Sequence, residues 1–144
     1  VLFRSGYLAD EELSWLEQCL ASNVVPHALV CIHHQPVNID CKWLDQIGLE
    51  NSDDLFETLA AYPQVKALLW GHIHQEFDEE RAGLRLISCP STCIQFKPRV
   101  DHFELDVLPP GYRWLELYED GTLKSEVNRL AEVTGEIDPG ATGE

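Results

Sequence analysis

Two short apolar segments, each followed at once by histidines, constrain the fold of this chain most strongly. Residues 28–32 run into His33 and His34, and residues 65–70 run into a Gly-His-Ile-His sequence at positions 71–74. Apolar runs of this length, without polar alternation, are typical of strands buried in a parallel sheet. The carboxyl ends of parallel strands lie at one edge of a sheet. We therefore predict that imidazoles from both strands meet there and form a metal site.

The segments next to these strands have helical periodicity. Leucines recur at spacings of three and four between residues 10 and 21, with Asp10 as the expected N-cap, and a second helix is expected from about residue 52 to Tyr62. The order helix, strand, helix, strand predicts an α/β layer with a right-handed crossover. In such a layer we expect Cys31 to be a buried small hydrophobe.

After residue 74 the pattern changes to short strand-like runs separated by turns. These runs are residues 75–80, 84–89, 92–96, 103–107, 112–118 and 122–129. Asp120 and Gly121, between the last two runs, are a strong hairpin signal. The fold class we predict is therefore mixed, α/β with α+β character, in one domain over residues 1–130. Residues 131–144 are expected to be a mobile acidic tail, and residues 1–5 do not fit the pattern that follows them.

Charge and composition narrow the classes of function. The 144 residues carry a formal net charge of -15, which disfavours binding to nucleic acid or to an anionic membrane surface. Phosphate esters stay allowed as substrates, because bound divalent cations reverse the local field. No apolar run is long enough to span a bilayer, and five cysteines without a disulfide spacing predict a reducing, cytoplasmic setting. The sequence makes no prediction of the oligomeric state.

The four histidines after the two strands form an incomplete hydrolytic centre by themselves, because such metals usually also have carboxylate ligands. The aspartates that could add an oxygen ligand fall in loops without special spacing: Asp40, Asp45 and Asp78. The two other histidines, His27 and His102, are interpreted as structural. A structural zinc held by Cys89 and Cys93 with Cys31 or Cys41 is an alternative, although the chain has no Cys-x-x-Cys.

At these residues the chain resembles a known family. The His-His-Gln-Pro at 33–36 and the Gly-His-x-His at 71–74 resemble the last two motifs of the calcineurin-like metallophosphoesterases. Residues 89–96 and 109–115 narrow the resemblance to the bacterial class III cyclic AMP phosphodiesterases. The similarity covers residues 6–130. It implies the C-terminal part of a metallophosphoesterase β-sandwich flanked by helices.

The resemblance also implies roles for individual residues. His33 and His72 would ligate one metal, His74 would ligate another, and His34 would support them without ligating. The expected lining of the nucleotide pocket is Ser91, Thr92, Gln95 and Phe96. The implied cofactors are two divalent metal ions, iron or manganese, and histidine with carboxylate ligands also suits zinc. The implied reaction is hydrolysis of a small-molecule cyclic nucleotide, cyclic AMP, to AMP.

The chain departs from the family pattern in one respect. The earlier family motifs, Asp-x-His, Gly-Asp and Gly-Asn-His, do not occur in it, so it holds no catalytic acid and only part of the ligand set. With no initiator methionine, it is expected to be a fragment that lacks an N-terminal portion, leaves core surface uncovered and is weakly active or inactive alone. The alternatives are a metallophosphoesterase for another phosphodiester, and a non-catalytic metal-binding or interaction module.

Overall fold

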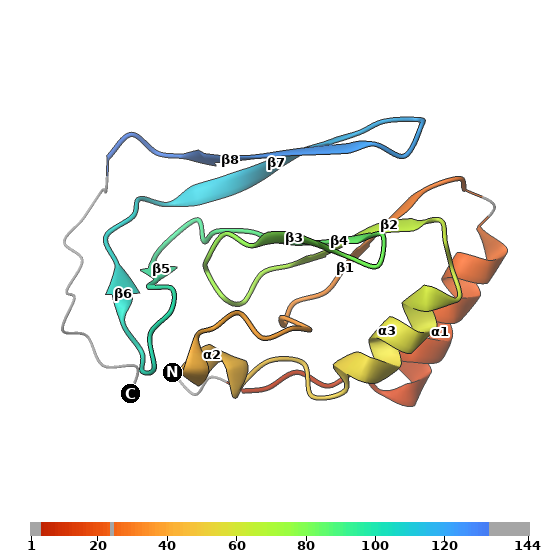
Figure 1. Ribbon diagram of the computed structural model, residues 1–144, viewed down its shortest axis with the longest axis horizontal. Coiled ribbons are helices and arrows are strands. Elements are labelled where there is room, and N and C mark those ends of the chain that lie inside the picture. The colour runs from red at the N-terminus through yellow and green to blue at the C-terminus, as the bar shows by residue number, and fades with distance from the viewer. Residues whose placement is uncertain (1–3, 24, 133–144) are drawn as a thin grey trace.

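The computed structural model describes residues 4–23 and 25–132 (Figure 1). Most of the predicted tail at 131–144 therefore lies outside the described residues. A central four-stranded sheet has the strand order β1-β2-β4-β3. Its strands are β1 (Ala28–Cys31), β2 (Val65–Trp70), β3 (Asp78–Arg81) and β4 (Leu84–Ser88). β1, β2 and β4 run parallel, whereas β3 pairs antiparallel with β4 at the outer edge.

Helices lie below one face of this sheet in the view of Figure 1. They are α1 (Asp10–Ser22), α2 (Lys42–Asp45) and α3 (Ser52–Ala60). Leu55 and Leu59 of α3 join Leu68 of β2 in one buried hydrophobic cluster, which explains why the apolar stripe of this helix faces the sheet. The helix, strand, helix, strand order predicted from periodicity is confirmed, and α2 adds a short turn that periodicity did not predict.

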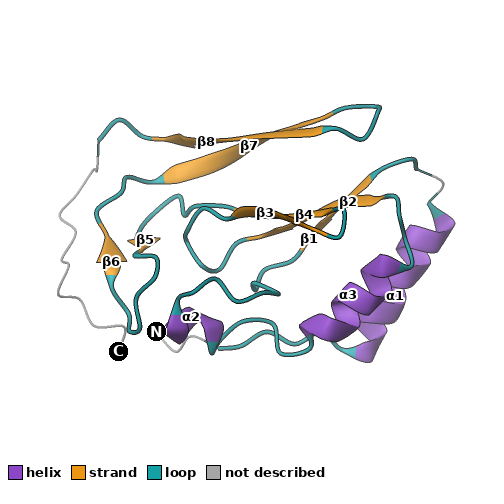
Figure 2. Ribbon diagram, in the orientation of Figure 1, coloured by secondary structure: helices purple, strands orange, loops and turns teal. Residues whose placement is uncertain are grey.

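A long hairpin lies above the opposite face of the sheet (Figures 1 and 2). It consists of β7 (Gly111–Leu117) and β8 (Leu123–Arg129), and a smaller pair consists of β5 (Gln95–Phe96) and β6 (Leu105–Asp106). Gly121 has φ 86° and the Asp120 carboxylate accepts the Thr122 N–H at 2.8 Å, so the predicted Asp-Gly turn closes the hairpin. The mixed α/β class with layered strands and helices is confirmed.

Two local predictions were wrong. Cys31 is exposed rather than buried, because β1 has β2 as its only strand neighbour among the described residues. Asp10 is the first residue of α1, not its cap, and the Glu12 carboxylate accepts the Ala9 N–H at 2.8 Å instead. Arg4, one of the five residues that do not fit the sequence pattern after them, nevertheless has a carbonyl oxygen 3.0 Å from a ring nitrogen of His34.

No helix within the described ranges is long and apolar enough to cross a membrane.

Candidate metal centre

The parallel pairing of β1 and β2 brings the two histidine-bearing turns together. Cys31 pairs with Leu69, and the ladder continues beyond both strands, because the Gly71 N–H donates to the His33 carbonyl at 3.2 Å. The imidazole centroids of His33 and His72 are 5.3 Å apart, and those of His34 and His72 are 4.3 Å apart. Histidines that lie far apart in the sequence therefore form one cluster at the carboxyl edge of the sheet.

The turn after β2 has an uncommon backbone. His72 and His74 have φ of 53° and 51°, in the left-handed region that residues with a Cβ rarely adopt. Ile73, between them, is fully buried and anchors the turn in the core. Backbone strain of this kind persists only where the surrounding structure enforces it, and it is common at functional sites.

Burial keeps the imidazoles of this turn neutral. Desolvation, followed by repulsion from His34, His33 and His74, lowers the pKa of His72 to about 4, while a hydrogen bond with the Ile47 backbone opposes the shift. Desolvation also lowers the pKa of His74, opposed by a hydrogen bond with the Ile94 backbone. A neutral imidazole is the form that ligates a metal.

Each of these two rings also has a nitrogen without a partner. His72 Nε2 and His74 Nδ1 are buried and make no hydrogen bond to the protein. A ring that hydrogen-bonds the backbone through one nitrogen commonly ligates a metal through the other. The donors of this turn therefore fit metal ions, and a ligated ion would satisfy each of these nitrogens.

His34 is held differently. Its Nε2 lies 3.0 Å from the Arg4 carbonyl oxygen, and a Cβ built on Gly6 would lie 2.4 Å from its Nδ1, so that face of the ring packs against the Gly6 backbone. Desolvation lowers the pKa of His34. Both ring nitrogens therefore face the segment that precedes α1.

Phe96 lies directly against His74. The two rings stack with centroids 4.3 Å apart and an interplanar angle of 6°, and Phe96 also packs edge-on against Trp43 and Phe103. Phe96 is only 2% exposed, so in this structure its ring supports the imidazole and offers no free surface to a ligand. No local pattern linked Phe96 to His74, because the two residues are distant in sequence.

The neighbouring loop, residues 91–95, is stabilised by hydrogen bonds between its own residues. The Gln95 side chain, 1% exposed, accepts the Ser91 N–H at 3.1 Å and donates to the Ser91 carbonyl at 2.7 Å. Ser91 Oγ accepts the Cys93 N–H at 3.0 Å. Of the four expected pocket residues, Thr92 is exposed and Ser91 is half-buried, so these two have surface available to a ligand.

Two of the three aspartates considered as possible ligands are engaged elsewhere. Asp45 accepts the N–H groups of Ile39 and Cys41, and Asp78 pairs with Arg85. Among residues 4–23 and 25–132, no group of three or more His, Cys, Asp or Glu side chains is arranged to hold a metal ion. The cysteine site considered above has no support either. The described part of the chain thus supplies nitrogen donors without a complete coordination sphere.

The sequence of this chain is similar to those of several cyclic nucleotide phosphodiesterases. The chain is 49% identical over 138 residues to the 3′,5′-cyclic adenosine monophosphate phosphodiesterase CpdA of Pseudomonas aeruginosa, covering 96% of this chain and 51% of that protein. It is 48% identical to the Escherichia coli K12 protein of the same name, with 96% and 50% covered. It is 39% identical to a 3′,5′-cyclic-nucleotide phosphodiesterase of Nostoc, with 87% and 47% covered. The chain therefore spans about half the length of the curated relatives it matches.

Two further comparisons add little. No protein-family profile matches the chain. A dimetal phosphatase from Danio rerio matches with a TM-score of 0.48 and 20% identity over 81% of this chain and 35% of that one, a similarity too low to carry an argument.

The sequence relatives confirm the resemblance to the bacterial cyclic AMP phosphodiesterases that residues 89–96 and 109–115 indicated. The chain is similar along nearly its whole length to proteins named as cyclic nucleotide phosphodiesterases.

Proposed function

We propose that this chain is the part of a cyclic nucleotide phosphodiesterase that supplies histidine ligands to a dinuclear metal centre, and that the complete protein hydrolyses cyclic AMP to AMP. The observation that carries the proposal is the pair of half-buried imidazoles, His72 and His74, each with an unpartnered buried nitrogen. Their position beside His33 supports a shared site. The relatives named as cyclic nucleotide phosphodiesterases support the substrate class.

In this proposal His33 and His72 hold one ion and His74 holds the other. His34 supports the site without ligating, in keeping with its contacts to Arg4 and Gly6. The two divalent ions, iron or manganese, with zinc also suited to the donors, would when bound supply activated water and neutralise phosphate charge. The residues of this chain lower the pKa of the His72 and His74 imidazoles, which favours their neutral form, and hold their orientation.

The cyclic nucleotide would contact the chain beside His74. Ser91 and Thr92 have exposed surface available to it. Gln95 stabilises the loop by hydrogen bonding to Ser91, and Phe96 stacks on the His74 imidazole. Five cysteines without a disulfide among them support the proposed cytoplasmic setting.

The test compares the 144-residue chain with the product of any longer open reading frame that contains it, each supplied with Mn²⁺, Fe²⁺ or Zn²⁺ and cyclic AMP. We expect turnover by the longer protein and little or none by the chain alone, because its described residues include no group of three or more His, Cys, Asp or Glu side chains arranged to hold a metal ion. In the longer protein, His72→Ala should abolish turnover, and His102→Ala, at an exposed histidine, is the matched control. Full activity of the short chain would refute the proposal.

A non-catalytic metal-binding or interaction module is a second candidate, because the described residues present unpartnered nitrogen donors but no group of three or more donors arranged to hold a metal ion. The metal stoichiometry of the longer protein distinguishes the two hypotheses. Two ions per chain would support the phosphodiesterase, and one or fewer would support the non-catalytic module. A substrate panel of cyclic AMP, cyclic GMP and bis-p-nitrophenyl phosphate separates cyclic AMP hydrolysis from action on another phosphodiester.

A further inference from the structure

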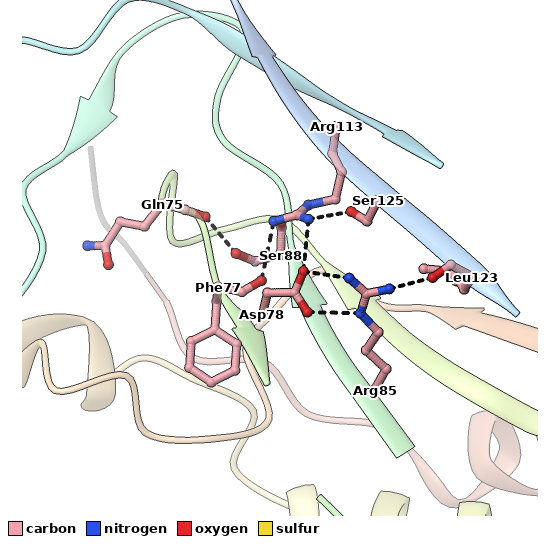
Figure 3. Close-up of polar contacts among 8 residues, drawn as sticks. All are labelled: Gln75, Phe77, Asp78, Arg85, Ser88, Arg113, Leu123 and Ser125. Carbon is pink, nitrogen blue, oxygen red and sulfur yellow. Dashed lines mark hydrogen bonds and ion pairs between the residues drawn. The ribbon is translucent and has the colours of Figure 1, made fainter. Parts of the chain in front are cut away.

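Arg113 is the most deeply buried cation of the ion pairs in the structure. It lies on β7, in a hairpin that is otherwise largely exposed, yet its side chain is only 4% exposed. A buried guanidinium is costly unless its donors are satisfied. In Arg113 they are satisfied by groups from other elements, which indicates that this residue joins the hairpin to the sheet beneath it (Figure 3).

The partners of Arg113 converge on the segment that follows His74. Its Nε donates to the Ser88 carbonyl at 2.6 Å, and its Nη2 donates to the Phe77 carbonyl at 3.3 Å. Its Nη1 contacts the Asp78 carboxylate at 3.4 Å and donates to Ser125 Oγ on β8. One side chain therefore ties the hairpin both to the end of β4 and to the entry into β3.

Ser88 carries the connection towards the histidines. It is fully buried, its N–H donates to the Phe77 carbonyl at 3.0 Å, and its hydroxyl donates to the Gln75 carbonyl at 2.6 Å. Gln75 follows His74 directly, and the left-handed φ of His74 needs support from its surroundings. Figure 3 shows the path from Arg113 through Ser88 to Gln75.

We propose that Arg113, acting through Ser88, is a positioning residue that holds the backbone after His74 and so sets the orientation of the His72 and His74 imidazoles. The relevance of this role to metal binding rests on the proposed function. Arg113 itself touches neither a ligand site nor the imidazoles. Its effect is transmitted through two hydrogen bonds in series, Arg113 to Ser88 and Ser88 to Gln75.

The structure offers a matched control in Arg85. Arg85 also joins the hairpin to the sheet, because it donates to the Leu123 carbonyl at 2.6 Å and pairs with Asp78 through two hydrogen bonds. It has no hydrogen bond to Ser88 or to Gln75 among those the structure shows. Loss of Arg85 should therefore loosen the hairpin without disturbing the histidine turn.

The experiment uses the 144-residue chain in four forms: wild type, Arg113→Lys, Ser88→Ala and Arg85→Lys. The first measurement is the imidazole nitrogen and carbon NMR signals of His72 and His74 without metal, with urea unfolding recorded in parallel. We expect these signals to shift or broaden in Arg113→Lys and Ser88→Ala and to stay in place in Arg85→Lys. Unchanged signals in both test variants, or equal changes in all three variants, would overturn the proposal.

A second measurement titrates Co²⁺ into each form. Removal of a group that orients a ligating histidine typically weakens metal binding about tenfold or more, so we expect that loss in Arg113→Lys and Ser88→Ala and less than about twofold in Arg85→Lys. If the wild-type chain binds no Co²⁺, as its incomplete ligand set allows, the NMR comparison alone decides the positioning role, and the proposed function is tested separately on the longer protein. If Arg113→Lys does not fold, Ser88→Ala decides alone, because it removes a single hydroxyl.

Discussion

The two histidine-bearing turns lie at the same edge of the sheet and are held in different ways. The turn after β1 leaves His33 exposed, and His34 is held by Arg4 and Gly6 in the segment before α1. The turn after β2 has left-handed backbone, a buried anchor at Ile73 and the stacked ring of Phe96. The second turn is organised by the core, whereas the first depends on a peripheral segment. The difference predicts that the second turn sets the geometry of the site.

The largest expected effect is from Phe96→Ala. Removal of a buried phenyl ring should cost about 3–5 kcal/mol of unfolding free energy and release the His74 imidazole that stacks on it. His33→Ala removes an exposed side chain of the other turn and should change the free energy of unfolding by less than about 0.5 kcal/mol. Urea denaturation of both variants measures the difference, and similar losses would remove the contrast between the turns.

Gly6→Ala tests how the first turn is held. The new Cβ would lie 2.4 Å from His34 Nδ1, so we expect an overpacking cost of about 1–3 kcal/mol together with a displaced His34 ring. NMR signals of His34 should move while those of His74 stay unchanged, since Gly6 is not among the groups found against His74. If the signals of both His34 and His74 move, the two turns are coupled and are not held independently.

Acidification should act mainly on the second turn. The pKa of His72 is lowered from 6.5 to about 4, so the unfolded chain binds its proton first and the stability of the metal-free protein falls as the pH drops from about 6.5 towards 4. His72→Gln should flatten this part of the profile of urea midpoint against pH, measured with a chelator present. A variant with the same slope as wild type would contradict the prediction.

The smallest effect is expected from Gly71→Ala. A Cβ at this position would lie 3.7 Å from His33 Nδ1, an ordinary contact, and Gly71 is not among the glycines with positive φ. Stability should therefore stay the same or rise by up to about 1 kcal/mol, because alanine restricts the unfolded chain. A clear loss in a thermal or urea melt would show that the space beside Gly71 is more confined than the contact distance indicates.

Much of the fold could be predicted from local sequence. The β2 strand at Val65–Trp70, the α3 helix at Ser52–Ala60 and the Asp-Gly hairpin turn follow from apolar runs, periodicity and turn chemistry, which act between near neighbours. Less of the candidate site could be predicted. The carboxylates Asp45 and Asp78 looked available in the sequence, but they accept hydrogen bonds from the Ile39 N–H and from Arg85, and no sequence pattern indicated these pairings.

The sequence by itself determined that two strands end in histidines and that parallel pairing must bring those ends together, because strand polarity and apolar burial are properties of short segments. Only the tertiary structure decided which side chains hold the imidazoles. Phe96 reaches His74, Arg4 reaches His34, and Arg113 reaches the turn through Ser88. These contacts join segments far apart in the chain, and their formation depends on how the layers pack rather than on any local preference.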